Sequence, residues 1–356
     1  MSTVSIPYNT PSALSDLSQR TEYEAWLLEA VYEIVNRRLA VQELHALIYP
    51  PNGGPPTQIV YGAGNIKLGD SNWCPGFLEA GAPLVFVTAF KLIDILLEWV
   101  LTRNGWTSTH RFEQKIQALK DRKRPVVFPA LIETRTWLRQ RLIALYEQLE
   151  PLRGTVIHDR HFTTTGGTLD VASSKRGKVG PVVKIASNDL RNLALVFVSL
   201  LRYLEGTWTM DLFQEKRIRH ALDELAHLHR SPPLGQPFPR FLRVRVYVPD
   251  VDPIEIDLGR IRSDIAATMP GQDVVFDVRI IAVARDGGSA TAHIIGWDQL
   301  QKMGPCLRKT RAELATSMVP LPADIDPAAA ARDLNLPPSG AATEPPPESL
   351  PQTAVN

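Results

Sequence analysis

The spacing of apolar residues divides this chain into a helical first part and a β-rich second part. Before residue 230, apolar residues recur every three or four positions in several runs, which is typical of helices that bury one face. After residue 240 they alternate with polar residues in short runs, which is typical of strands. The runs predict helices over residues 18–47, 82–104, 111–120, 129–149, 188–205 and 210–229.

Segments without this periodicity set the expected domain boundaries. Residues 1–17 are polar and are expected to form a flexible arm. Residues 231–239 contain four prolines and one glycine, which predicts a linker between a helical domain of residues 18–230 and a small module of residues 240–312. From residue 319 onward proline and alanine dominate, so we expect a disordered tail over residues 319–356.

A β-hairpin is expected inside the helical domain. Residues 163–185 replace the helical pattern with threonine, valine and glycine, which favour strands and a tight turn. Its tip would carry Lys175, Arg176 and Lys178. The predicted fold class is therefore α+β: an N-terminal helical bundle with a β-hairpin insertion, then a small C-terminal α+β or β-rich module and the tail.

Composition places the chain among globular proteins with a core. Of its 356 residues, 44% are hydrophobic and 22% are charged. Its two cysteines, Cys74 and Cys306, are far apart and outside any metal-ligand spacing, which fits a reducing compartment. The most apolar run, residues 82–101, contains charged side chains that disfavour a membrane span, and the N-terminus has no secretory signal. We expect a soluble, cytoplasmic protein that does not contact a membrane.

Charge is unevenly distributed, although the whole chain carries a net charge of only +1. Residues 103–184 contain sixteen Lys and Arg against seven Asp and Glu, a local net charge of +9. Such a segment suits a polyanion, typically RNA or DNA. A basic surface that is matched by acids elsewhere in the fold is the alternative. The residues expected to contact nucleic acid are Lys120, Arg122, Lys123, Arg124, Lys175, Arg176 and Lys178.

The densest group of chemically functional side chains follows the predicted helix 129–149. It contains Arg153 and His158, with Arg160 and His161 close behind. Cleavage of RNA without a metal needs a group that transfers a proton and a fixed cation for the charge that develops on the phosphate. Histidine titrates near neutrality and arginine keeps its charge, so His158 is the candidate proton-transfer group and Arg153 the candidate phosphate clamp.

The spacing of these two residues requires an irregular helix. Five residues along an ideal α-helix differ in direction by about 140°, so Arg153 and His158 share a face only if the helix ends or kinks between them. Pro151 and Gly154 favour such an irregularity.

The segment Leu152–His158, an arginine with a histidine five positions later, follows two long predicted helices and resembles the signature of the HEPN superfamily. The resemblance covers about residues 22–161. It implies a helical bundle, commonly dimeric, and for active members a metal-independent RNase without a cofactor, found in toxin–antitoxin and phage-defence systems. RNA, a second copy of the chain and an antitoxin or other protein would be the partners. Arg153 and His158 would be the catalytic pair.

One position departs from the pattern of active members. The residue after the arginine, typically Asn, Asp or His, is Gly154. A catalytically inactive member that binds nucleic acid or a protein is therefore the alternative. Arg160 and His161 would compensate by placing a second cation and imidazole nearby. The purely structural interpretation is a helix C-terminus whose cations complement the helix dipole.

Two acidic residues on the predicted helix 82–104 are further candidates. Asp94 and Glu98 lie one helical turn apart, so both can meet the same neighbour. Supporting residues of the catalytic pair are expected among these two carboxylates together with Arg160 and His161. A solvent-exposed helix edge is the structural alternative.

A second constellation lies on the predicted helix 210–229. His220, Asp223, Glu224 and His227 fall at positions that can face one side of a helix. Two imidazoles and a carboxylate form a ligand set for zinc, iron or manganese. A metal-dependent enzyme that uses His220, Asp223 and His227 is thus a third hypothesis, although a second helix would have to supply further ligands. The motifs of serine and cysteine nucleophiles are lacking.

Overall fold

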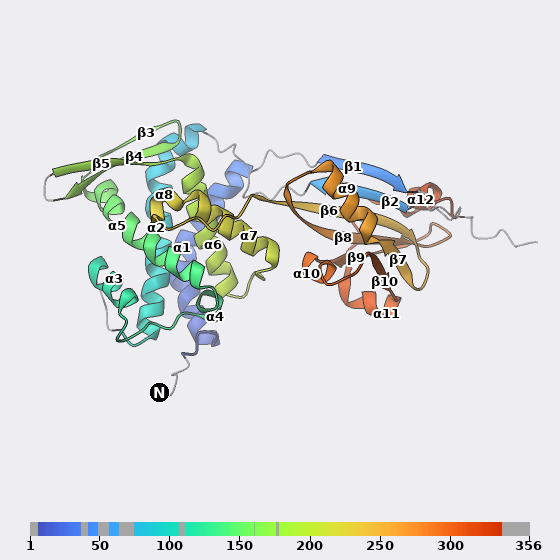
Figure 1. The fold of residues 1–356 in the computed structure, drawn as a ribbon, viewed down its shortest axis with the longest axis horizontal. Helices are drawn as coiled ribbons and strands as arrows, with labels where there is room; N and C mark the ends of the chain where they lie inside the picture. Colours follow the sequence, from blue (N-terminus) through green and yellow to red (C-terminus); the bar gives the residue numbers. More distant parts are fainter. Residues whose placement is uncertain are drawn as a thin grey trace, which may run out of the picture. The chain divides into compact units, whose positions relative to one another are not determined.

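The protein is α+β, and its chain folds into two compact units (Figure 1). The computed structural model describes residues 6–36, 42–48, 57–63, 75–106, 111–159, 161–175 and 178–336. Unit 1 is formed by Met1–Val41 and Asn65–Arg240, and unit 2 by Gln42–Gly64 and Phe241–Asn356. The chain therefore enters unit 2 early, forms one hairpin there and returns to unit 1.

Helix α2 (Pro75–Arg103) lies at the centre of unit 1, in contact with α1, α3, α5 and α6. Phe86, Phe90, Ile93 and Trp99 on this helix are all buried. A helix that is apolar on every side is stable only when neighbours cover it completely. The other helices of unit 1 are α1 (Pro11–Asn36), α3 (Phe112–Lys120), α4 (Ala130–Glu133), α5 (Thr136–Gly154), α6 (Ser187–Leu204), α7 (Leu212–Glu224) and α8 (Ala226–His229).

The charged residues of α2 have partners on neighbouring helices. The Nζ of Lys91 lies 2.5 Å from the Oε1 of Glu24 on α1. Asp94 and Glu98 both accept hydrogen bonds from Lys115 on α3. These ion pairs explain how the largely buried middle of the helix carries Lys91, Asp94 and Glu98. Within the described ranges, no helix has the length and apolar character needed to cross a membrane.

A three-stranded antiparallel sheet lies at one end of the unit 1 helices, in contact with α2 and α5 (Figure 1). β4 (Thr168–Lys175) pairs with β3 (Phe162–Thr165) on one side and β5 (Lys178–Ile185) on the other. The predicted hairpin is correct for β4 and β5, but β3 is an additional strand. Gly166 and Gly167 have φ of 55° and 77°, so they form the tight turn between β3 and β4 that other residues would resist.

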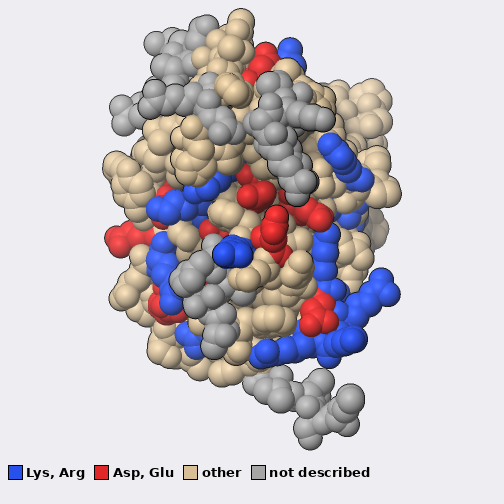
Figure 2. Space-filling model, turned by 90° about the vertical axis from the view of Figure 1, so that its left-hand side faces the viewer, with Lys and Arg blue, Asp and Glu red and all other residues tan. Residues whose placement is uncertain are grey.

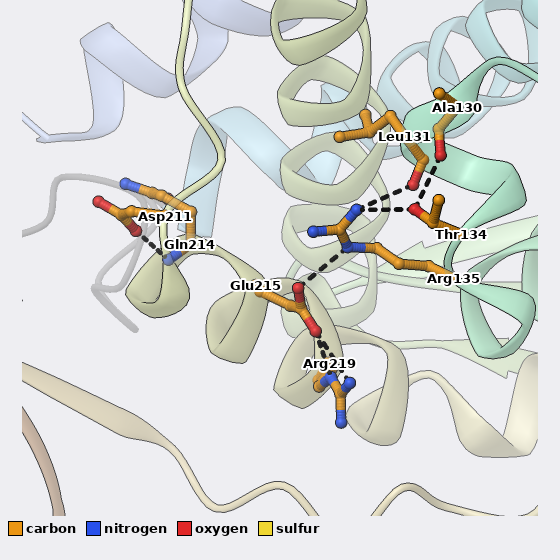
Figure 3. A network of polar contacts seen from close by, with 8 residues as sticks. All are labelled: Ala130, Leu131, Thr134, Arg135, Asp211, Gln214, Glu215 and Arg219. Atoms are coloured by element: carbon orange, nitrogen blue, oxygen red, sulfur yellow. Dashed lines mark hydrogen bonds and ion pairs between the residues drawn. The ribbon is translucent and has the colours of Figure 1, made fainter. Parts of the chain in front are cut away.

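The start of α5 is attached to α7 by a charged network (Figure 3). Arg135, which precedes the first residue of α5, donates through Nε to Glu215 (2.9 Å) and through Nη1 to the carbonyl of Leu131 (3.2 Å). Glu215 also accepts from Arg219 (2.8 Å), whose guanidinium lies 4.7 Å from the ring centroid of Trp137. These contacts fix the first turn of α5, and its opposite end carries the candidate catalytic pair.

Unit 2 is built on a six-stranded sheet in the order β1-β2-β6-β8-β9-β11. The hairpin of β1 and β2 pairs antiparallel with β6 through β2. The strands of unit 2 are β1 (Gln42–Ile48), β2 (Thr57–Ala63), β6 (Pro239–Pro249), β7 (Ile254–Asp257), β8 (Asp273–Val283), β9 (Ala290–Ile295), β10 (Cys306–Lys309) and β11 (Met318–Val319), and its helices are α9 (Leu258–Thr268), α10 (Trp297–Leu300), α11 (Arg311–Leu314) and α12 (Pro327–Asp333).

The alternation of residues along β6 and β8 gives the sheet two different faces. Val244 on β6 and Val278 on β8 point to a core shared with α9, α10, α11, β7 and β10. On the opposite face, Tyr247 and Ile281 pack against α12, where Leu334 is fully buried. The small module predicted over residues 240–312 is thus a sheet covered mainly by helices on one face.

Three predictions about the ends of segments are wrong within the described residues. The flexible arm is largely helical, because α1 begins at Pro11 and Ala13 and Leu17 are fully buried. The first helix ends at Asn36 rather than at residue 47, because residues 42–48 pair as strand β1 with β2. Residues 319–336 are not a disordered tail, because α12 packs on the sheet. Residues 337–356 lie outside the described part.

Candidate active site

Helix α5 continues past Pro151 and is followed by a π-helical turn, Thr155–Asp159. Proline cannot donate the backbone hydrogen bond that an α-helix requires at this position, which weakens the last turn. The hydroxyl of Thr155 donates to the carbonyl of Pro151 at 3.1 Å, four residues back along the chain. Turns closed by i→i+5 bonds are rare and often occur at functional sites. The expected irregularity is therefore present, although it begins after Gly154 and not at Pro151.

The π turn changes the direction of His158 relative to Arg153. In an α-helix, residues five apart differ in direction by about 140°. A helix with i→i+5 hydrogen bonds has more residues per turn than an α-helix, so residues five apart lie closer to one face. The wider turn thus reduces the angular separation that a regular helix would impose on this pair.

Arg153 is held against α3 and beside a carboxyl group. Its guanidinium lies 5.3 Å from the ring centroid of Phe112, and the residue is half-buried. Burial raises the pKa of the Glu150 carboxyl, the charge of Arg153 lowers it, and Glu113 raises it further. Arg153 is therefore a cation supported by an aromatic ring and faced by an acidic side chain.

His158 is exposed, and its imidazole makes no hydrogen bond or ion pair with the part of the chain that the structure describes. His161 is also exposed, and its backbone carbonyl accepts a hydrogen bond from the amide of Ala172 at 3.1 Å, which fixes it at the start of the small sheet. Arg160 lies outside the described residues. Of the two histidines, His158 is the one on the π turn with Arg153 five residues before it.

Asp94 and Glu98 both pair with the buried Lys115, although the Glu98 side chain itself is 45% exposed. The Nζ of Lys115 lies 2.8 Å from Asp94 and 2.6 Å from Glu98, and the Lys115 side chain is 4% exposed. The Tyr146 hydroxyl also donates to Asp94, and burial together with that carboxylate raises the pKa of Tyr146. The prediction that both acids meet one neighbour is confirmed. Their contacts attach α3 to α2 and to Tyr146 of α5.

An open hollow of about 880 Å³ lies along α3. Its lining includes Glu113 and Lys120 of α3, Glu147 of α5, and Trp106. Lys120 and Glu147 form an ion pair of 2.5 Å. Glu113 of α3 and Glu147 of α5 have no signal in the sequence as lining residues, because the contact between the two helices has no local spacing pattern.

The basic turn after α3 is only partly available to a ligand. Arg124 donates to the carbonyls of Asn104 (3.2 Å) and Gly105 (3.0 Å) and stacks on Trp106 at 4.6 Å. It therefore caps the C-terminal end of α2, as a cation near that end of the dipole should. Arg122 and Lys123 are exposed, and their side chains have no ion-pair partner among the described residues.

The predicted basic hairpin tip is described only in its backbone. Lys175 and Lys178 pair with each other at the ends of β4 and β5, and Arg176 lies outside the described residues. On the side of the molecule seen in Figure 2, lysines and arginines surround a group of acidic side chains rather than form an unbroken basic surface. The alternative of a basic segment matched by acids is thus correct in part.

The predicted metal ligands on α7 and beyond have other partners. Asp223 accepts hydrogen bonds from the backbone amides of Leu234 and Gln236, and His220 Nδ1 lies 3.0 Å from the carbonyl of Gln236. His227 Nε2 instead lies 3.2 Å from Asp189. Across the described ranges, no three His, Cys, Asp or Glu residues converge as metal ligands. His220 and Asp223 therefore attach the linker of residues 231–239 to α7, and the metal-site hypothesis is wrong for these residues.

Comparisons with known proteins found no match: no family model, no curated protein and no solved structure is significantly similar to this chain.

Proposed function

We propose that the protein is a metal-independent endoribonuclease of HEPN type in which Arg153 and His158 form the catalytic pair. The observation that carries the proposal is the π turn Thr155–Asp159, because it supports a position of His158 closer to the face of Arg153 than a regular helix allows. The exposed imidazole, which has no partner among the described residues, is consistent with a group that must reach a substrate.

The chemistry divides between the two side chains. The 2′-hydroxyl of RNA attacks the adjacent phosphorus, and the bond from phosphorus to the 5′-oxygen of the next nucleotide breaks. One group must accept the hydroxyl proton and another must protonate the leaving oxygen, and a histidine suits both tasks near neutral pH. Arg153 would stabilise the additional negative charge on the phosphate oxygens. A second copy of the chain would bring a second His158, so that one imidazole acts as base and the other as acid.

Glu150 is expected to modulate this site. Its carboxylate partly neutralises Arg153, which weakens the attraction of a phosphate. Burial raises the pKa of Glu150, so it is protonated more readily than an exposed glutamate, and a bound phosphate would favour its protonation further. Protonation of Glu150 would leave the charge of Arg153 available to the substrate.

RNA degradation in the presence of excess chelator tests the proposal. Replacement His158→Ala is expected to lower the cleavage rate by about 100-fold or more, as for the loss of a general acid–base group. His227→Ala is the matched control, since it removes another exposed histidine, on α8, that has no part in the proposed site. Equal activity of wild type and His158→Ala, or loss of cleavage on chelation alone, would overturn the proposal.

A second candidate function is an inactive HEPN-like protein that binds nucleic acid or another protein. It is favoured by Gly154, which stands where the resemblance implies a polar side chain. A Cβ atom added at Gly154 would meet no atom within 4 Å, so a larger residue fits there. If Gly154→Asn cleaves RNA and the wild type does not, the chain is an inactive member of the proposed type.

A further inference from the structure

The sheet of unit 2 carries a cluster of arginines on the face opposite its core. Arg243 and Arg245 on β6 and Arg279 on β8 occupy the positions that alternate with the buried valines, so they share one face. Helix α12 covers the part of this face near Tyr247 and Ile281. Beyond that cover, the side chain of Arg243 is 42% exposed. We call Arg243, Arg245 and Arg279 the arginine face.

Two of the three arginines have carboxylate partners. Arg243 donates to both oxygens of Asp277, with the shortest contact at 3.0 Å, and the Asp277 side chain is 10% exposed. Arg245 donates to Asp324 at 2.9 Å and to the Tyr247 hydroxyl at 3.3 Å. The carboxylates of Asp277 and Asp324 thus pair with two of the three guanidinium groups.

Arg279 is the group that this arrangement leaves unmatched. Among the described residues, its guanidinium makes no ion pair, and its Nε is buried without a hydrogen-bond partner. Burial lowers the pKa of Arg279 and the charges of Arg243 and Arg245 lower it further, whereas the carboxylates of Asp277 and Asp324 raise it. A guanidinium nevertheless keeps its proton at neutral pH. The fold therefore holds a cation beside two others, an arrangement that costs stability unless an anion joins it.

We propose that the arginine face binds the phosphate backbone of single-stranded RNA. Guanidinium groups match phosphate oxygens with two parallel hydrogen bonds, and arginines on adjacent strands of a flat sheet can contact successive phosphates. The ring of Phe241, on the same face at 5.9 Å from the Arg243 guanidinium, adds a surface on which a base can stack. The choice of RNA over an acidic peptide rests on the proposed function. Unit 2 then holds the substrate that unit 1 cleaves.

The test is RNA binding by the full chain in a His158→Ala background, where cleavage does not interfere. The probe is a fluorescein-labelled single-stranded oligoribonucleotide, followed by fluorescence anisotropy at several salt concentrations. Arg279→Gln is expected to raise Kd by about tenfold or more, as for the loss of a charge-assisted hydrogen bond. It is also expected to reduce the slope of log K against log salt by about 0.7. Arg279→Lys is expected to restore part of the affinity.

The control variant is Arg285→Gln, which removes an exposed arginine from the turn between β8 and β9 in the same unit. An unchanged Kd and salt slope for Arg279→Gln would overturn the inference, as would an equal loss for Arg285→Gln. Poly-glutamate that competes as well as RNA of the same charge would assign the face to an acidic protein instead. RNA binding lost in Arg279→Gln, from a chain that does not cleave RNA, supports this inference and contradicts the proposed function.

Discussion

The Lys115 cluster of unit 1 and the arginine face of unit 2 both bring charged side chains together. They differ in how completely carboxylates pair with the cations. Lys115 is almost fully buried and bonds to two carboxylates, Asp94 and Glu98. On the arginine face, Arg243 and Arg245 are each paired with a carboxylate, and Arg279 has no ion-pair partner among the described residues. In the first arrangement the buried cation has carboxylate partners. In the second, one cation has no ion-pair partner among the described residues.

This difference separates a structural cluster from a candidate binding site. Removing one partner of a buried ion pair is strongly destabilising, because it leaves an uncompensated charge in the interior. An unmatched cation that a fold retains is a cost that a bound anion can offset, which is the usual relation between stability and function at a binding surface. The comparison therefore predicts opposite signs for the effects of removing Lys115 and of removing Arg279 on stability.

The largest expected effect is that of Lys115→Met. The substitution leaves Asp94 and Glu98 without their shared cation, and Asp94 is bonded to Tyr146 in the interior. Breaking a buried ion pair in this way should lower the free energy of unfolding of unit 1 by about 3 kcal/mol. Urea unfolding followed by circular dichroism at 222 nm reports mainly on the helices of unit 1. Lys120→Met is the control, because its ion pair with Glu147 is exposed and should contribute less than about 1 kcal/mol. Similar losses in the two variants would contradict the structural role of the cluster.

A smaller effect on stability is expected from His229, a buried histidine whose two ring nitrogens are both hydrogen-bonded in the neutral form. Its Nδ1 accepts from the amide of Ser231 (3.0 Å), so its Nε2 carries the proton and donates to the carbonyl of Leu222 (2.7 Å). Burial lowers the pKa of His229 in the folded state. As the pH falls through the unfolded value of about 6.5, the unfolded state binds the proton first, so stability is lost toward acid with a slope of up to about 1.4 kcal/mol per pH unit.

The measurement compares wild type with His229→Asn at pH 7.5 and pH 5.5. Asparagine keeps an acceptor for Ser231 but does not titrate, so the variant should lose less stability on acidification. Glu150 and Asp189, whose pKa values are raised by burial, act in the opposite direction, but they are present in both proteins and cancel in the difference. A wild type and a His229→Asn variant with the same pH dependence would show that His229 titrates normally.

Most of the unit 1 helices could be predicted from the sequence, because each buries apolar residues at helical spacing. Helix α6 and the end of α2 lie within a residue or two of their expected positions. The first helix was misplaced for two reasons. Its buried start uses Ala13 and Thr21, which carry little hydrophobic signal, and residues 42–48 become a strand through pairing with β2. This hairpin in turn pairs with β6, and a partner so far along the chain is not encoded in local periodicity.

Only those features of the candidate site that are local in the sequence could be predicted. Pro151 and Gly154 indicated an irregular helix end, and the π turn is present. The contact of Arg153 with Phe112 and the acidic neighbour Glu113 come from α3, whose attachment to α5 depends on tertiary packing. The metal hypothesis failed because helical spacing brings His220 and Asp223 to one face but does not reveal that the linker already occupies them.

The smallest expected effect is a gain in stability where the preceding variants lose stability. It therefore tests the difference between the Lys115 cluster and the arginine face most directly. Arg279→Gln removes a cation that repels Arg243 and Arg245 but also attracts Asp277 and Asp324, so relief of the like-charge contact across strands should stabilise unit 2 by at most about 0.5 kcal/mol in the absence of RNA. Arg243→Gln should destabilise the same unit, because it leaves the buried Asp277 without its partner. Amide hydrogen exchange of peptides from β6 and β8 measures both changes locally. Slower exchange in Arg279→Gln, together with faster exchange in Arg243→Gln, identifies Arg279 as the unmatched charge. Faster exchange in both variants would mean that all three arginines serve the fold, and the difference between the two clusters would disappear.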